Sequence, residues 1–305
     1  LLDDQKVVYE TAIAMAKKAQ NGKKHVLIVE GGPGTGKSVV AINLLVNLTN
    51  IGIVSQYVSK NSEPRKVYTA KLTGNFKKTY INNLFTGSGC FIDAPNDTYG
   101  ALIVDEAHRL NEKSGLYGNV GENQIHEIIK AAKFSVFFVD DRQRIHVKDI
   151  GSKNYIKEIA ENEGAVIHTT QLSSQFRCNG SDGYLSWLDN ALQIRETANI
   201  RLAPEEYDFR IFSTPNELFD KIVEKNKINN KSRVVAGYCW KWKSKKNLDE
   251  FDIVFPQFNF KKQWNLNSSN TPWLLGKESI NQIGCIHTCQ GLELDYVGVI
   301  VGNDL

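Results

Sequence analysis

Short apolar runs alternate along the chain with segments that carry apolar side chains at helical spacing. Residues 26–29 have the composition of a buried strand, and residues 39–48 carry a helix-like pattern. Two further apolar runs occur within residues 100–110 and 134–145, and residues 4–20 have the pattern of an amphipathic helix. Strands that alternate with helices are typical of a parallel sheet, so the pattern predicts an α/β fold.

The length of 305 residues suits either one large α/β domain or two lobes with separate cores, and we favour two lobes. The first lobe is predicted to span residues 1–192 and the second residues 193–305. A polar, proline-containing stretch at 195–208 would be the linker or the entry to the second lobe. A second, incomplete sheet would be built from strand-like runs at 209–212, 233–238 and 296–301.

Composition narrows the class of protein. Lys and Arg number 37 against 34 Asp and Glu, a formal charge of +3, so any nucleic-acid surface must be a local patch. The five scattered cysteines lack a Cys-x-x-Cys pair, which fits reduced thiols in a cytoplasmic protein. The spacing Cys285-x-His287-x-Cys289 matches no familiar zinc site.

The ends of the chain and its longest apolar runs bear on location. No signal peptide and no apolar run of membrane length is visible, so we expect a soluble protein with no membrane partner. Because the chain starts without Met and ends on an apolar, strand-like run, we also expect further domains beyond both termini.

A glycine-rich sequence lies at the first predicted strand-to-helix junction. The residues GGPGTGKS, 31–38, satisfy the phosphate-binding pattern G-x-x-x-x-G-K-[ST]. The glycines let backbone N–H groups face phosphate oxygens, and the helix N-terminus adds a favourable dipole. Lys37 would reach the β- and γ-phosphates, and Ser38 would ligate Mg²⁺. The predicted ligands are ATP and Mg²⁺, held by Gly31, Gly32, Pro33, Gly34, Thr35, Gly36, Lys37 and Ser38.

Two later apolar runs end in acidic residues. In "GALIVDEAHRL", residues 100–110, Asp105 would hold Mg²⁺ and Glu106 would orient and deprotonate the attacking water. In "FSVFFVDDRQRI", the run is followed by Asp140 and by Gln143, whose amide would sense the γ-phosphate. Taken alone, either stretch is also consistent with solvated polar residues at the end of a strand.

The order of these motifs resembles that of superfamily 1 helicases. The DEAH acids and Asp-x-x-Gln are followed by "LSSQFRC" at 172–178 and "IHTCQGLELD" at 286–295, which are similar to helicase motifs IV and V. The motifs "SKNSEPRKV", "VDDRQRI" and "IGCIHTCQGLELDYVGVIVG" resemble the bacterial Schlafen-like helicase domain family. The Ser-Ala-Thr and Gln-x-x-Gly-Arg-x-x-Arg motifs of superfamily 2 DEAH helicases are absent from the sequence.

The resemblance implies two RecA-like lobes that bind ATP and step along single-stranded DNA or RNA. Phe176 would stack on the adenine, Arg177 would touch the γ-phosphate, and Gln5 would read the adenine edge. Gly291 and Glu293 would lie near the nucleotide at the lobe interface. The arginine of motif VI does not occur before the last residue, so we expect slow hydrolysis, since loss of such an arginine costs about 10³-fold in rate.

Two locally basic stretches are candidate nucleic-acid surfaces. Residues 60–78 hold six basic residues and one acid, and residues 221–246 hold nine and one. In the second stretch Trp240 and Trp242 alternate with lysines, which suits stacking on unpaired bases, although core tryptophans beside a solvated face fit equally well. The predicted nucleic-acid contacts are Ser59, Asn61, Arg65, Trp240, Trp242, His287 and Thr288.

Two questions stay open at this point. The aromatic-rich residues 251–273 are either an insert that packs on the second sheet or a further stacking surface. The alternative function is an ATP-dependent switch or RNA-binding module that holds nucleotide without unwinding anything.

Overall fold

The computed structural model describes residues 1–73, 78–115, 118–144, 146–174, 182–202, 207–265 and 272–302. The chain forms two compact units. The first comprises residues 1–60 and 82–209, and the second comprises residues 61–81 and 210–305. The predicted lobe boundary after residue 192 stays a prediction.

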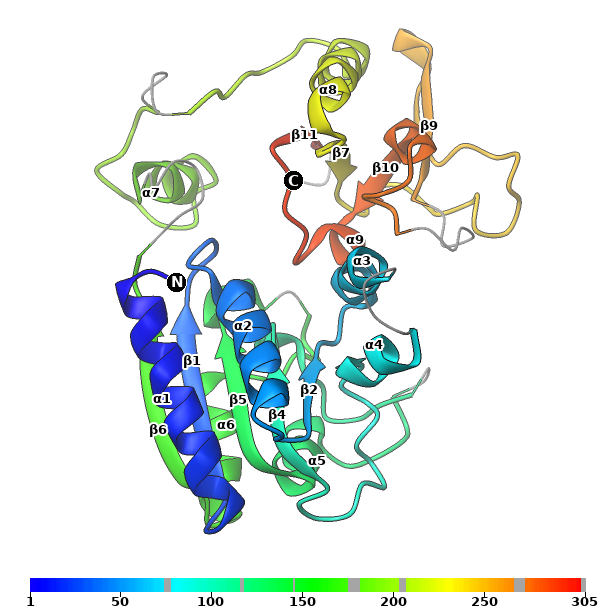
Figure 1. The fold of residues 1–305 in the computed structure, drawn as a ribbon. Coiled ribbons are helices and arrows are strands. Elements are labelled where there is room, and N and C mark those ends of the chain that lie inside the picture. The colour runs from blue at the N-terminus through cyan, green and yellow to red at the C-terminus, as the bar shows by residue number, and fades with distance from the viewer. Residues whose placement is uncertain are drawn as a thin grey trace. The chain divides into compact units, whose positions relative to one another are not determined.

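A six-stranded parallel sheet forms the centre of the first unit (Figure 1). Its strands are β1 (His25–Gly31), β2 (Ser55–Val58), β3 (Phe85–Thr86), β4 (Tyr99–Val104), β5 (Ala132–Val139) and β6 (Val166–Leu172). The order across the sheet is β3-β2-β4-β5-β1-β6, and every pair is parallel. The carboxyl ends of β1, β5 and β4 are therefore neighbours, which brings their loops to one edge of the sheet.

Helices cover both faces of this sheet (Figure 1). On one face lie α1 (Asp3–Gln20) and α2 (Lys37–Asn50), and on the other lie α5 (Gln124–Ala131) and α6 (Lys153–Asn162). The other helical elements of the unit are α7 (Asp182–Ala191), η1 (Ala107–Arg109) and η2 (Asp141–Gln143), and the boundary between the units falls within α4 (Lys78–Leu84). Because helices bury both faces, β1 and β5 consist of nearly continuous apolar residues.

Local sequence signals explain where two of these helices begin. The side chain of Asn123 accepts hydrogen bonds from the backbone N–H groups of Ile125 and His126 at the start of α5. Ser152 accepts one from Tyr155 at the start of α6. Such caps satisfy donors that have no partner within the helix.

A five-stranded sheet of order β11-β7-β10-β9-β8 forms the second unit. Its strands are β7 (Ser232–Ala236), β8 (Ile253–Phe255), β9 (Phe260–Trp264), β10 (Gln282–Cys285) and β11 (Tyr296–Ile300). All neighbours are parallel except β8 and β9, which form an antiparallel pair. Its helical elements are α3 (Ser62–Leu72), α8 (Pro215–Asn229), α9 (Ile286–Cys289), η4 (Pro256–Phe258) and η5 (Glu278–Asn281). The α/β class is confirmed, with a fully parallel sheet in the first unit; the prediction of a parallel sheet in the second unit is wrong for β8, which runs antiparallel to β9.

The second sheet tests the predicted strands of this unit and the two alternatives for the aromatic-rich segment 251–273. The predicted strands at 233–238 and 296–301 are β7 and β11, but the predicted strand at 209–212 is wrong. The ring of Phe209 packs edge-on against Trp187, with centroids 4.8 Å apart, instead of joining a sheet. The aromatic-rich segment packs onto the sheet as β8 and β9, with Trp264 fully buried.

Arg233 is fully buried in the second unit and interacts with neutral acceptors. Its guanidinium donates to the carbonyl oxygens of Leu274 at 2.7 Å and Ser232 at 2.8 Å, and to Oδ1 of Asn226 at 2.7 Å. A further bond reaches the hydroxyl of Ser279 at 3.0 Å. Burial lowers the pKa of Arg233 to about 10, so the side chain stays charged at neutral pH. The charge is thus solvated by protein dipoles, which tie the segment before β10 to β7.

We expect Arg233→Met to destabilise the protein by about 2–5 kcal/mol, because it leaves several buried acceptors without a donor. Urea unfolding followed by tryptophan fluorescence measures this loss. The matched control is Arg195→Met, because Arg195 forms an exposed ion pair with Asp189 and its loss should cost less than about 1 kcal/mol. Equally small losses of stability in both variants would contradict the proposed role of Arg233 in tying the segment before β10 to β7.

Candidate nucleotide-binding site

The loop predicted to hold phosphate connects β1 to α2 at the carboxyl edge of the first sheet. Gly34 and Gly36 have φ angles of 77° and 82°, in the left-handed region that favours glycine. At Gly36 a Cβ atom would lie 2.2 Å from Nε2 of Gln5, so a side chain at this position would displace the end of the Gln5 side chain. The loop ends at Lys37, where α2 begins and its first N–H groups face the loop.

Lys37 is buried and is held by its own loop. Its ammonium donates to the carbonyl oxygens of Gly31 and Gly32, both at 2.8 Å. These two carbonyls satisfy the charge without a carboxylate. A triphosphate would replace them with anionic oxygens, which are stronger acceptors for an ammonium.

Gln5 lies against the same loop. It is buried on α1, and its Nε2 donates to the carbonyl oxygen of Thr35 at 3.2 Å. The neighbouring Asp4 accepts hydrogen bonds from the backbone N–H groups of Ser173 and Ser174, just after β6. The structure therefore brings Gln5 to the phosphate-binding loop.

Asp105 lies at the carboxyl end of β4 and is almost completely buried. Its Oδ2 accepts hydrogen bonds from Oγ of Ser38 and from the hydroxyl of Tyr57, each at 2.6 Å. Burial raises the pKa of Asp105, and the negative charge of Glu106 adds to the rise, while the two hydrogen bonds oppose it. A carboxylate and a hydroxyl side by side fit Mg²⁺, which prefers oxygen ligands.

Glu106, the residue after Asp105, has a backbone φ of 53°, in the left-handed region. Nε2 of His108 lies 3.0 Å from Oε2 of Glu106. On its other side, Nδ1 of His108 accepts a hydrogen bond from the backbone N–H of Asp140 at 3.2 Å. The ring of His108 is therefore in close contact with the Glu106 carboxylate through Nε2 and accepts a hydrogen bond through Nδ1. The buried His108 thus connects the acids after β4 with the acid after β5.

The polar residues after β5 form the short helix η2. Oδ1 of Asp140 accepts a hydrogen bond from the backbone N–H of Arg142, which caps this helix. Oδ2 of Asp140 is buried and has no hydrogen-bond partner among the residues that the structure describes. Gln143 is half-buried at the end of η2. This edge of the sheet therefore holds acceptors that a ligand or water would satisfy.

The other predicted nucleotide contacts fall elsewhere. Phe176 and Arg177 lie outside the described residues. Gly291, with φ 81°, and the exposed Glu293 lie in the second unit, just after α9. Their roles remain predictions.

The predicted nucleic-acid residues vary in exposure. Ser59, in the first unit, and Asn61 and Thr288, in the second, are buried. Arg65 is half-buried on α3 and its Nε donates to the carbonyl oxygen of Asn61 at 3.3 Å. His287 is exposed, with its ring 5.7 Å from that of Tyr238.

The two α-helices that carry these residues lie against each other in the second unit. Nδ2 of Asn61 is 3.5 Å from both the carbonyl and the side-chain oxygen of Gln290. A Cβ atom at Gly291 would lie 3.0 Å from Pro64 of α3. The start of α3 and the stretch that resembles motif V are therefore neighbours.

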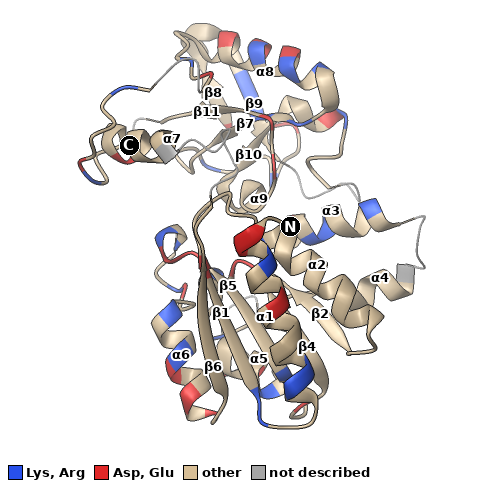
Figure 2. Ribbon diagram, turned by 60° about the vertical axis from the view of Figure 1, so that its left-hand side comes forward, with Lys and Arg blue, Asp and Glu red and all other residues tan. Residues whose placement is uncertain are grey.

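The two tryptophans of the basic stretch pack against the second hydrophobic core. Trp240 lies 5.5 Å from Phe255 and Trp242 lies 6.0 Å from Trp264, measured between ring centroids. Both are half-buried, whereas Lys241 is exposed. The basic character of this stretch is weaker than its sequence indicates, because Arg233 is internal and the lysines of α8 share that helix with acidic residues (Figure 2).

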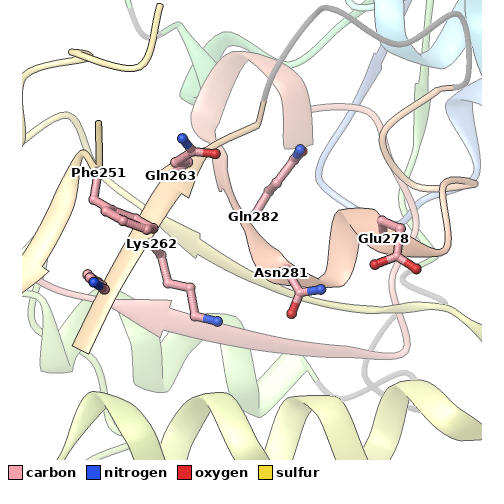
Figure 3. Close-up of a pocket in the computed structure, with 7 residues that line it drawn as sticks. Phe251, Lys262, Gln263, Glu278, Asn281 and Gln282 are labelled. Atoms are coloured by element: carbon pink, nitrogen blue, oxygen red, sulfur yellow. The ribbon is translucent and has the colours of Figure 1, made fainter. Parts of the chain in front are cut away.

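A cavity of about 330 Å³ lies in the second unit at β9 and η5. It is lined by Phe251, Lys261, Lys262, Gln263, Glu278, Asn281 and Gln282. In Figure 3 the labelled side chains point in different directions rather than toward one place. The cavity therefore lacks the converging polar groups of a small-molecule site.

Metal-ion sites and membrane-spanning helices are considered for the described residues alone. No group of three or more His, Cys, Asp or Glu side chains there is arranged to hold a metal ion, so Cys285, His287 and Cys289 do not form such a group. Among the described helices, none combines the length and the apolar character that a bilayer crossing requires.

Comparison with known families decides what this chain is related to. Residues 24–305 match the family described as Schlafen group 3, DNA/RNA helicase domain. The chain belongs to this family. The match includes the phosphate-binding loop, the DEAH acids and the motif V stretch, so this Schlafen group 3 domain has a nucleotide-binding helicase-type fold.

More distant similarities accompany this match. An uncharacterized protein of Saccharomyces cerevisiae, YPL245W, is 25% identical over 317 residues, which cover 91% of this chain and 68% of the yeast protein. Pif1 helicase from Candida albicans is 14% identical with a TM-score of 0.38, over 74% of this chain and 54% of Pif1. Domain III of the replication initiation protein DnaA from Thermotoga maritima is 12% identical with a TM-score of 0.34, over 76% of this chain and 88% of that structure.

Sequence reasoning missed two residues of the site. Tyr57 gave no signal, because its approach to Asp105 depends on the pairing of β2 with β4. His108 was visible within the DEAH letters, but its contact with Asp140 depends on the neighbouring positions of β4 and β5.

A tight backbone approach supports the turn that carries Glu106 and His108. A Cβ atom at Gly151 would lie 1.8 Å from the carbonyl oxygen of Ala107. The adjacent Asp149 is buried, and its Oδ2 lies 3.0 Å from Nε of Arg109. The loop before α6 therefore braces η1 from outside.

We expect Gly151→Ala to lower the free energy of unfolding by about 1–3 kcal/mol, because the methyl group displaces backbone at the turn. Chemical unfolding measures the change. The control is Gly22→Ala, since a Cβ atom at the exposed Gly22 would lie 3.4 Å from the nearest heavy atom. A Gly151 variant as stable as this control would show that the brace is not needed.

Proposed function

We propose that this Schlafen group 3 domain is an ATP- and Mg²⁺-dependent motor of the superfamily 1 type, which moves along single-stranded DNA or RNA. The observation that carries the proposal is the arrangement at the sheet edge, where Ser38 and Asp105 share a hydrogen bond of 2.6 Å and Glu106 follows directly with His108 at its carboxylate. A simple nucleotide-binding loop would not need the second acid.

The proposed hydrolysis assigns one task to each residue. Lys37 exchanges the carbonyls of Gly31 and Gly32 for the β- and γ-phosphates, while Gln5 contacts the adenine. Ser38 and Asp105 hold Mg²⁺, which would neutralise charge on the phosphates. Glu106 accepts the proton of the attacking water at its carboxylate.

The γ-phosphate is proposed to be sensed through the residues after β5. Gln143 would contact it, and a shift of η2 would reach Glu106 through the bond between Asp140 and His108. By resemblance to the family, Arg177 would add a positive charge at the same phosphate, and Phe176 would stack on the adenine.

Coupling to the nucleic acid is proposed to use the second lobe, residues 193–305. Gly291 and Glu293 would respond to the nucleotide, and loss of the γ-phosphate would remove contacts that favour one arrangement of the lobes. The supporting observations are the exposed Lys241 between the tryptophans and the adjacency of α3 and α9. The proposed strand contacts are Ser59, Asn61, Arg65, Trp240, Trp242, His287 and Thr288.

We expect Lys37→Ala and Glu106→Gln both to abolish turnover, for different reasons. Loss of the ammonium weakens binding of the triphosphate, whereas loss of the general base lowers kcat by about 10²–10⁴-fold with nucleotide still bound. Steady-state ATPase rates and the affinity for a fluorescent ATP analogue separate the two effects. Glu10→Gln, an exposed change on α1, is the control and should behave as the wild type. Wild-type turnover in either site variant would refute the assigned roles.

We expect unpaired polynucleotides to stimulate hydrolysis many-fold, because a motor couples the two activities. ATPase rates are measured with oligo(dT), with oligo(U) and without nucleic acid, and strand binding is measured by fluorescence anisotropy at two salt concentrations. Binding should weaken at the higher salt, since phosphate contacts release counterions. Tight ATP binding with rates indifferent to either strand would instead support a nucleotide-dependent switch.

A further inference from the structure

Tyr57 is a buried tyrosine whose hydroxyl has a specific partner in the candidate site. The ring is 1% exposed and packs against Phe85, with centroids 5.6 Å apart. The residue lies near the end of β2, beside β4, where its Cα pairs with that of Ile103. Its hydroxyl donates to Oδ2 of Asp105 at 2.6 Å. Neighbouring strands therefore supply the carboxylate and its donor.

The carboxylate of Asp105 is fixed from three directions. Oδ2 accepts from Tyr57 and from Ser38, and Oδ1 accepts from the backbone N–H of Glu106 at 3.0 Å. The backbone donor moves with Asp105 itself, and Ser38 lies on the phosphate-binding loop, where a nucleotide acts directly. Tyr57 is the donor that comes from a different strand and that a nucleotide does not need to touch.

We propose that Tyr57 is a positioning residue that orients the Asp105 carboxylate for Mg²⁺. The inference rests on the proposed ATP·Mg²⁺ function, because it assigns Asp105 to the cation. A neutral hydroxyl holds the rotation of the carboxylate without supplying a positive charge that would compete with the cation. Hydrogen-bonded partners of metal ligands act in this way, and their loss typically lowers metal affinity by about 10–100-fold.

The proposal separates two parts of nucleotide binding. Lys37, Gln5 and the loop backbone bind the nucleotide whether or not Mg²⁺ is present. Tyr57 acts through Asp105, so it contributes to the additional affinity that Mg²⁺ supplies. The Tyr57→Phe variant keeps the buried ring and removes only the hydroxyl, which makes it the appropriate change.

The test measures binding of a fluorescent ATP analogue in EDTA and across a Mg²⁺ titration. We expect Tyr57→Phe to bind the analogue as the wild type does in EDTA and to need about 10-fold more Mg²⁺ for the same enhancement. Asp105→Asn should lose the Mg²⁺-dependent enhancement. Tyr99→Phe, at the opposite end of β4, is the matched control and should leave the titration unchanged.

The outcomes separate failure of the proposed ATP·Mg²⁺ function from failure of the proposed role of Tyr57. A wild-type chain whose analogue binding does not respond to Mg²⁺ would overturn the proposed function itself. A normal response in the wild type together with an unchanged Mg²⁺ midpoint in Tyr57→Phe would overturn only the role of Tyr57. Equal weakening in EDTA and in Mg²⁺, with a lowered thermal unfolding temperature, would indicate a structural role and would also overturn it.

Discussion

The parallel order of β4, β5 and β1 is the constraint on which the candidate site depends. Parallel strands end at one edge, so the phosphate-binding loop after β1, Asp140 after β5 and Asp105 after β4 become neighbours although they are distant in the sequence. Because β5 lies between β1 and β4, the polar turn after β5 lies between the loop after β1 and the acids Asp105 and Glu106. His108 then connects that turn to Glu106 by one hydrogen bond and one close contact.

Each unit contains a buried ionisable side chain that forms several hydrogen bonds with neutral partners. Asp105 accepts from two hydroxyls and one backbone N–H, and Arg233 donates to carbonyl and amide oxygens. The surroundings of Asp105 and of Arg233 suit different roles. Burial of Arg233 is complete and its donors reach many acceptors, which suits a fixed structural link. Asp105 is hydrogen-bonded to Ser38 of the loop after β1, where the proposed Mg²⁺ would bind.

Local sequence patterns predicted most of the strands and helices of the first unit. Side-chain contacts between strands that are distant in the sequence could not be predicted in this way. The loop at 31–38 and the acids at 105 and 106 each follow an apolar run, so their place at the ends of strands follows from local sequence. The hydroxyl of Tyr57 meets Asp105 only because β2 pairs with β4, and no local pattern encodes that pairing. In the second unit the sequence counted Arg233 as part of a basic surface, because charge alone does not distinguish a solvated arginine from one that internal carbonyls surround.

The contact of Lys37 with its own loop has a consequence for selectivity. The ammonium of Lys37 already donates hydrogen bonds to the carbonyl oxygens of Gly31 and Gly32. An incoming anion must therefore displace these two hydrogen bonds. A small anion such as free orthophosphate, which engages only a few loop N–H groups, gains little by displacing these hydrogen bonds. A nucleoside triphosphate compensates for the exchange through several phosphate oxygens at once. At the proposed nucleotide site, this exchange would favour a triphosphate over simple anions.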